Sequence, residues 1–288
     1  MKRYQLITGM LLLACSRGTP GADLYMETTF ILRTAELPST RAGKPDETRI
    51  TDYNIFIFNS FGDLEECAFL RGNPLEYHTR LLRDVPYTLV AAANLGYQLP
   101  IQCLADAQAY RYPMAYPDEY REGIPMAAVW ENRPVQEQTV LRVERLMARI
   151  DIRLDRTQLE EGVLMKVTDV CISNCPSSVT LFPGSRVESA SQVFRQGFSL
   201  GKEEVEALNR DQADGLSGTA SLYLLENSGE THRSYVELKA AYHDDHFHTA
   251  PGEPLVYRIP LENVVRNTVY PLVITLSGMP STPSPYLR

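Results

Sequence analysis

The strongest constraint on the fold of this chain is a change in the phase of its apolar residues near position 145. Before that point the apolar side chains fall at odd positions, Leu141 and Val143. After it they fall at even positions: Leu146, Ala148, Ile150, Ile152 and Leu154. Successive side chains of a strand point to opposite faces, so one strand cannot bury both sets against one core. We therefore predict a bulge or crossover near Glu144 and Arg145, where the chain passes between two domains.

The length and composition agree with two globular domains. A chain of 288 residues is long for one small domain and sufficient for two that each bury a core. Hydrophobic residues make up 44% and charged residues 22%, which excludes a largely disordered protein. We predict an all-β protein with two β-sandwich domains, residues 24–145 and 146–288.

Period-two alternation and turn residues locate the individual elements. Short helices are predicted at residues 100–110 and 201–210. No repeat of fixed period is visible. Strands are predicted near residues 24–33, 50–58, 86–94, 124–135, from 139 onward with the break near 145, and near 165–172, 220–225, 234–242, 255–261 and 268–276.

The N-terminus carries a targeting segment. Lys2 and Arg3 precede an apolar run over residues 6–13, which is too short to span a bilayer. The run ends at Cys15 and resembles a bacterial lipobox, in which the cysteine thiol receives a diacylglycerol. We predict a lipoprotein signal peptide over residues 1–15 and anchoring in the outer membrane through lipid on Cys15. An ordinary secretory signal with a chance cysteine is the alternative.

The segment after the leader predicts a removable first strand. Residues 16–23 are a flexible tether. Residues 38–46 form a breaker-rich loop that contains Arg41 and separates the strand from the rest of the sheet. The alternating apolar edge of the strand consists of Leu24, Met26, Phe30 and Leu32.

Charge and motifs disfavour the common ligand-binding and catalytic classes. The chain has 36 acidic and 28 basic residues, a balance unsuited to nucleic acid. Gly-rich phosphate loops, a GxSxG elbow and an HExxH helix are missing from the sequence. Paired carboxylates such as Glu65 and Glu66 have no spacing that indicates acid/base work. We predict no catalytic site and no cofactor.

Two groups of residues each have two possible interpretations. His and Asp side chains over residues 243–248 are explained either as a polar hairpin tip or as an adventitious metal site, and we predict no metal. The four remaining cysteines are explained as buried thiols or as one or two disulfides, whose pairing the sequence does not select: Cys67, Cys103, Cys171 and Cys175.

Several segments in order resemble the FimA-type fimbrillin superfamily of Bacteroidetes. Each segment alone is a weak strand or turn motif, but their order along most of the chain is specific. They are the lipobox at Cys15, ITDYNIFIFNSFGDL (50–64), PYTLVAAAN (86–94), IPM (124–126), RLMARIDI (145–152), LYLLEN (222–227), YVELKAAY (235–242) and VVRNTVYPLVITLSG (264–278).

This resemblance implies two transthyretin-like Greek-key sandwiches and a non-enzymatic fimbrial subunit at the cell surface. It also implies that a trypsin-like protease cuts behind the first strand, and that a strand from another fimbrial subunit fills the resulting groove. Arg41 stands where the cleaved arginine is expected, and a plain loop arginine is the alternative.

The C-terminal segment favours a particular position in the fibre. Residues 279–288 include three prolines, which cannot donate to a ladder, so we expect a tip or minor accessory subunit. A FimB-like anchor is the alternative. A glycan-binding surface lipoprotein using Trp130 or tyrosines is the runner-up of another class, and a host or bacterial adhesion target is a further expected partner.

Overall fold

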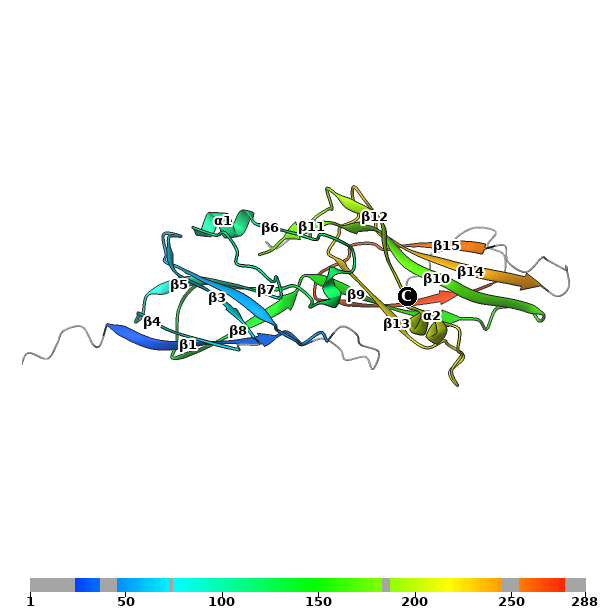
Figure 1. Ribbon diagram of the computed structural model, residues 1–288, viewed down its shortest axis with the longest axis horizontal. Helices are drawn as coiled ribbons and strands as arrows, with labels where there is room; N and C mark the ends of the chain where they lie inside the picture. The colour runs from blue at the N-terminus through cyan, green and yellow to red at the C-terminus, as the bar shows by residue number, and fades with distance from the viewer. Residues whose placement is uncertain (1–23, 37–45, 73–74, 183–186, 245–253, 278–288) are drawn as a thin grey trace, which may run out of the picture.

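The chain folds mainly into strands, as predicted. The computed structural model describes residues 24–36, 46–72, 75–182, 187–244 and 254–277, and the structural statements below concern these residues. Figure 1 shows two strand-rich halves lying end to end along the long axis. Each half is built of packed β-layers, so the structure confirms the β-sandwich class.

The elements follow one another in simple chain order. The first half contains β1 (Tyr25–Thr34), β2 (Asp52–Phe58), β3 (Leu64–Arg71), β4 (Glu76–Leu82), β5 (Pro86–Ala93), α1 (Leu104–Ala109), β6 (Arg111–Pro113), a 3-10 turn (Glu119–Arg121), β7 (Met126–Pro134) and β8 (Gln138–Arg145). The second contains β9 (Met147–Asp155), β10 (Val163–Pro176), β11 (Ser178–Thr180), β12 (Val193–Ser199), α2 (Lys202–Leu208), β13 (Ala220–Leu225), β14 (Tyr235–Asp244), β15 (Pro254–Pro260) and β16 (Val269–Thr275). Helices α1 and α2 confirm the two that the sequence predicts.

The phase change near residue 145 corresponds to a change of sheet. Strand β8 belongs to a seven-stranded sheet and β9 to a three-stranded one. Between them Leu146 is fully buried, and its amide donates to the carbonyl of Pro125 at 2.8 Å. The side-chain register therefore resets at one residue, because each strand faces a different core.

The two halves share one strand topology although their sequences show no repeat. The seven-stranded sheet has the order β3-β2-β5-β7-β8-β1-β4, in which β7 and β8 pair through only two residue pairs. When the seven-stranded sheet is divided at this short junction between β7 and β8, it consists of two layers, β3-β2-β5-β7 and β8-β1-β4. The second half has the layers β12-β10-β14-β15 and β16-β9-β13. Strand for strand and in chain order, the two arrangements correspond, and β9 is the counterpart of β1.

The core of the first half forms around β2. All seven residues of this strand are buried, as expected for an interior strand that is apolar on both faces. The one buried amide on it, Asn54, donates to the carbonyl of Tyr97 at 3.0 Å and accepts from the amide of Leu99 at 2.9 Å. This side chain holds the segment that leads to α1. Figure 1 shows α1 on the side of the first half that lies away from β1.

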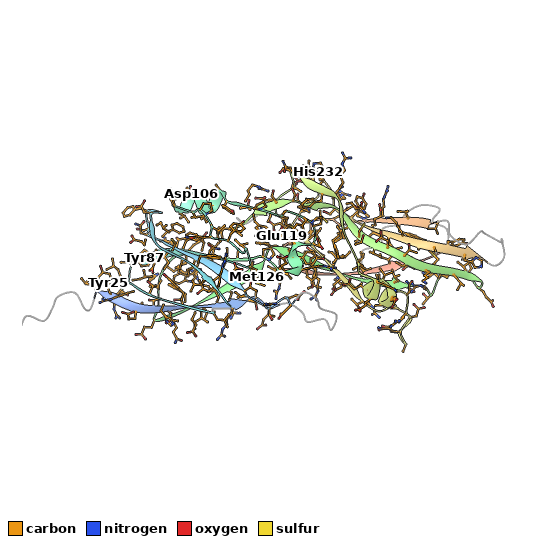
Figure 2. All side chains as sticks on the ribbon, viewed as in Figure 1. Tyr25, Tyr87, Asp106, Glu119, Met126 and His232 are labelled. Atoms are coloured by element: carbon orange, nitrogen blue, oxygen red, sulfur yellow. The ribbon has the colours of Figure 1, made fainter. Side chains whose placement is uncertain are left out.

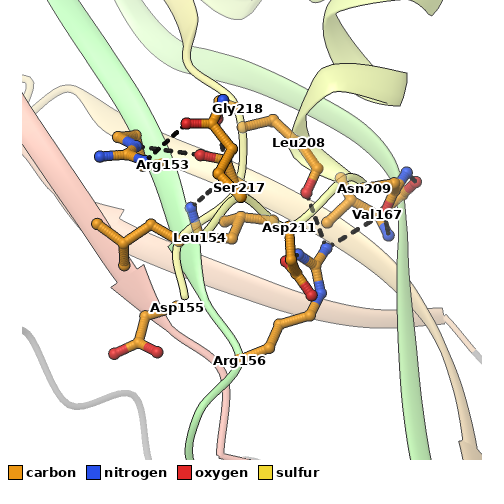
Figure 3. A network of polar contacts seen from close by, with 12 residues as sticks. Arg153, Leu154, Asp155, Arg156, Val167, Leu208, Asn209, Asp211, Ser217 and Gly218 are labelled. Atoms are coloured by element: carbon orange, nitrogen blue, oxygen red, sulfur yellow. Dashed lines mark hydrogen bonds and ion pairs between the residues drawn. The ribbon is translucent and has the colours of Figure 1, made fainter. Parts of the chain in front are cut away.

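A polar network fixes α2 against β9 and β10 in the second half (Figure 3). Arg156 donates to the carbonyl of Leu208 at 2.9 Å and so satisfies a helix-end acceptor. The Asn209 amide exchanges two 2.8 Å hydrogen bonds with the backbone of Val167. Ser217 pairs with the Leu154 backbone. The loop between α2 and β13 is therefore held by specific side chains.

A short ladder joins the two halves. Strand β6 of the first half pairs antiparallel with β11 of the second, with Tyr112 opposite Val179. Beside this ladder Arg266 makes a buried ion pair with Glu226 at 2.6 Å and donates to the carbonyl of Thr180 at 2.9 Å. Side chains of the second half, including Val179, also complete the apolar core of the first.

Candidate functional site

Strand β1 lies in the interior of its sheet, not at an edge. It pairs antiparallel with β4 on one side and parallel with β8 on the other. The alternating pattern predicts one buried face and leaves the neighbours of the strand open, and in the structure the sheet continues beyond β1 through β4. Tyr25, the first residue of β1, lies at the outer end of this half in Figure 2.

The inward face of β1 differs by one position from the predicted set. Met26, Phe30 and Leu32 are buried, with 8%, 0% and 1% of their surface exposed. Leu24 precedes the strand and is 61% exposed, so its inclusion is an error. The fourth inward residue is Thr28, which sequence reasoning missed because a threonine does not stand out in an apolar series.

Backbone hydrogen bonds continue to both ends of β1. The amide of Arg83 donates to the carbonyl of Leu24 at 2.8 Å at one end, and the amide of Ala35 donates to the carbonyl of Val143 at 2.9 Å at the other. Covalently, however, β1 joins the rest of the sheet only through the connection to β2. A break in that connection would leave the strand held by noncovalent contacts alone.

One arginine holds both described ends of the connection between β1 and β2. The Arg145 guanidinium donates to the carbonyl of Ala35 through Nη1 and to the carbonyl of Glu47 through Nε, both at 2.9 Å. It also donates to the side-chain oxygen of Asn267 at 3.0 Å. Arg145 is 2% exposed, so these acceptors replace water for a buried cation. Both described ends of the connection are thus fixed to the same side chain.

Glu47 connects the same segment to the second half. Its carboxylate accepts from Arg149 at 2.8 Å and from the Tyr223 hydroxyl at 2.7 Å. Arg149 also pairs with Asp151 at 3.0 Å. Burial, reinforced by the hydrogen bond to Glu47, raises the pKa of Tyr223, so the phenol stays a donor at neutral pH.

Strand β4, the outer neighbour of β1, is fastened to β3 by a carboxylate. Glu66 on β3 accepts hydrogen bonds from the hydroxyls of Tyr77 and Thr79 on β4. Burial and the contact with Glu66 raise the pKa of Tyr77. Since β3 and β4 are the two ends of the seven-stranded sheet, these bonds bring its edges together. They also hold β4 by contacts that do not depend on β1.

The other residues singled out in the sequence lie apart from β1 or outside the described residues. Cys15 and Arg41 fall outside them, as do positions 245–248. In the described part of the chain no three metal-ligating side chains converge, and no helix has the length and apolarity of a membrane span. Trp130 is half-buried and packs against the core, which does not favour a sugar-stacking surface.

The four described cysteines are free thiols, so the structure supports the thiol interpretation over disulfides. Cys67 is exposed, whereas Cys171 and Cys175 are buried on β10. Burial raises the pKa of Cys175 to about 12, which suppresses its thiolate.

Comparisons with known proteins identify the fold. No protein-family profile and no curated protein sequence matches the chain. A proposed cell adhesion protein from Bacteroides eggerthii DSM 20697 superposes with a TM-score of 0.64 at 13% identity, over 92% of this chain and 93% of that one. The fimbrilin FimA from Porphyromonas gingivalis W83 gives 0.63 at 14% identity, over 90% and 92%.

A third solved structure is a fimbrial tip protein. The C-terminally truncated Mfa3 from Porphyromonas gingivalis superposes with a TM-score of 0.56 at 13% identity, over 90% of this chain and 96% of that one. In each case the similarity covers both halves of this chain and nearly the full length of the compared structure. The chain therefore has the two-sandwich fold of solved fimbrial and cell-adhesion structures, the fimbrilin and the tip protein of Porphyromonas gingivalis among them.

Proposed function

We propose that this chain is a non-enzymatic subunit of a bacterial surface fimbrium, assembled when β1 is released and a strand from a neighbouring subunit takes its place. The observation that carries the proposal is the position of β1. It is an interior strand with two ladders, yet only one covalent connection joins it to the sheet. Its removal would open a groove between β8 and β4 with unpaired backbone on both walls.

The energetics of the groove require an occupant. Full burial of a large apolar side chain is worth about 1.5–3 kcal/mol, and β1 buries three of them, Met26, Phe30 and Leu32. The ladder groups of β8 and β4 would lose their partners as well. An extended segment with alternating apolar side chains replaces both kinds of contact, which is the logic of strand addition.

The connections in the second half support confining the proposed exchange to the first half. Its counterpart of β1 is β9, which pairs with β13 and β16 in the same way. However, β9 is continuous with β8 at one end and with the chain leading to β10 at the other. One backbone cut cannot free it. We accordingly treat residues 24–145 as the exchanging domain and 146–288 as a permanently closed one.

Cleavage at Arg41 is the proposed trigger. The cut would release β1 but leave Glu47 attached to Arg145 and Arg149, so the new N-terminus would not loosen the contact with the second half. Lipid on Cys15 would hold the precursor on the outer membrane until that cut. Within the fibre we propose a tip or other minor position, with the anchor role as the alternative, and gold labelling of fibres distinguishes the two ends.

Limited trypsin digestion tests the proposal. We expect an early cut at Arg41, after which the chain takes up a fluorescent synthetic peptide of residues 24–36. The Arg41→Ala variant should resist that cut and take up no peptide. Arg41→Lys is the matched control, because trypsin still cleaves after lysine and uptake should return. A cleaved chain that remains monomeric and binds neither this peptide nor a strand of another fimbrial subunit would refute strand exchange.

A further inference from the structure

The hydroxyl of Thr28 is a defect in the packing of β1. The residue is 1% exposed, in the inward row between Met26 and Phe30. Among the described residues its Oγ1 has no hydrogen-bond partner, although it is buried from solvent. Buried polar groups are normally paired, so this hydroxyl needs an explanation.

The strand opposite Thr28 makes no hydrogen bond with its hydroxyl. Across the antiparallel ladder the residue facing it is Thr79 on β4. The hydroxyl of Thr79 is already committed as a donor to Glu66, and so is that of Tyr77, which faces Phe30. Apolar side chains occupy the neighbouring inward positions of β1. The site around Thr28 therefore suits a methyl group better than a hydroxyl.

We propose that Thr28 weakens the hold of the groove on β1, so that the groove prefers a neighbouring subunit's strand carrying an aliphatic residue at the position that faces Thr79. The proposal rests on the strand exchange above and adds the chemistry of the incoming segment. A buried hydroxyl without a partner loses its hydration and regains nothing, whereas an apolar group of similar shape has no hydration to lose. The complex with the incoming strand is then lower in free energy than the complex with β1, so exchange requires no external energy source.

The register defines the rest of the preferred segment. Large apolar side chains would face Leu81 and Tyr77, in the pockets that Met26 and Phe30 occupy now. Between them a β-branched aliphatic residue such as valine would fill the site of Thr28. The segment would run parallel to β8, as β1 does. The outward positions are exposed or half-buried and restrict its sequence less.

The experiment uses the full chain cleaved at Arg41, with β1 initially in place. Three labelled peptides of residues 24–36 compete for the groove: the natural sequence, Thr28→Val and Thr29→Val. We expect the Thr28→Val peptide to bind about tenfold more tightly than the natural one, equivalent to about 1.4 kcal/mol. The Thr29→Val peptide carries the same change on the outward face, where the hydroxyl contacts His78, and should show no gain.

Two further measurements compare the variant chains before and after cleavage. The uncut Thr28→Val chain should unfold at a higher urea concentration than the natural chain, and after cleavage its β1 should leave about tenfold more slowly. The Thr29→Val chain should show neither effect. Equal affinities for the natural and Thr28→Val peptides, with equal unfolding midpoints, would overturn this inference and leave strand exchange intact. Failure of all three peptides to bind would instead overturn the exchange itself, and the inference with it.

Discussion

A terminal nitrogen of Arg149 on β9 donates to both carboxylate oxygens of Glu47, at 2.8 and 2.9 Å. Glu47 lies in the segment that follows β1, so this contact joins the exchanging sheet to the second half. The side chain of Arg149 is 2% exposed and that of Glu47 is 15% exposed. The pair is therefore largely shielded from solvent screening.

Replacing Glu47 should destabilise the junction between the halves. Glu47→Gln removes the charge that faces Arg149 and leaves the guanidinium with Asp151 as its remaining carboxylate. Breaking a buried pair on one side costs about 3–5 kcal/mol, and we expect the lower end because Asp151 stays. Urea unfolding measures the loss. The exposed Glu36→Gln variant is the control, and a similar midpoint in the two variants would contradict the assignment.

Two substitutions on and beside β1 should differ sharply in stability. Phe30→Ala empties a fully buried position and should lower the free energy of unfolding by about 3–5 kcal/mol. Leu24→Ala removes a 61% exposed side chain and should change it by less than about 0.5 kcal/mol. Chemical denaturation of both variants measures the contrast. A large effect of Leu24→Ala would mean that the residue packs in a way this structure does not show.

Glu66 should matter more after β1 has left than before. With β1 present, β4 has a ladder partner; without it, the hydroxyl contacts of Tyr77 and Thr79 to Glu66 remain to hold β4 to β3. Glu66→Ala should therefore change β4 amide exchange slightly in the uncut chain and at least tenfold after cleavage and β1 release. Hydrogen exchange with mass spectrometry resolves this segment. Equal protection in cleaved natural and variant chains would show that Glu66 does not hold the groove wall.

The Arg111 to Glu188 contact should make the link between the halves sensitive to acid. Burial acts to raise the pKa of Glu188, but hydrogen bonds from Thr180 and Arg111 outweigh it and hold the pKa below its usual value. Because the pKa of Glu188 is lower in the folded chain than in the unfolded chain, its ionised form stabilises the fold at pH values above the unfolded-state pKa of about 4.3. This stabilisation is lost as the pH falls through the folded-state pKa. The free energy of unfolding of Glu188→Gln, measured by urea denaturation, should thus be lower than that of the natural chain at pH 6. The difference between the two chains should be smaller at pH 3. A difference in free energy of unfolding that is the same at pH 6 and pH 3 would exclude this role of Glu188 ionisation.

Lipid attachment is tested at Cys15. Cys15→Ala removes the only thiol at the proposed lipidation position, so unprocessed or mislocalised precursor should accumulate. Mass spectrometry of the membrane-extracted protein reports the acyl mass and the mature N-terminus. Cys67→Ala is the matched control and should leave both unchanged. Normal acylation of the Cys15→Ala protein would rule out the lipoprotein assignment.

Local patterns determined a large part of this fold. Period-two alternation indicated many of the strands but not β3, β4 or β12, and the phase change at Leu146 marked the passage from β8 to β9, because the direction of a side chain along a strand depends only on its position. The two short helices also followed from their own residues. Met26, Phe30 and Leu32 were recognisable as inward-facing because they share one parity in a strand.

Pairing between distant segments was decided only by the tertiary structure. Alternation shows which face of β1 is buried but not how many neighbours the strand has, so its interior position between β4 and β8 could not be predicted. The exposure of Leu24 depends on where that sheet ends. The contact of Glu47 with Tyr223 spans 176 positions, and the buried hydroxyl of Thr28, which makes no hydrogen bond, lies opposite Thr79, whose own hydroxyl donates to Glu66. Such features depend on which strands lie side by side, and periodicity carries no information about that choice.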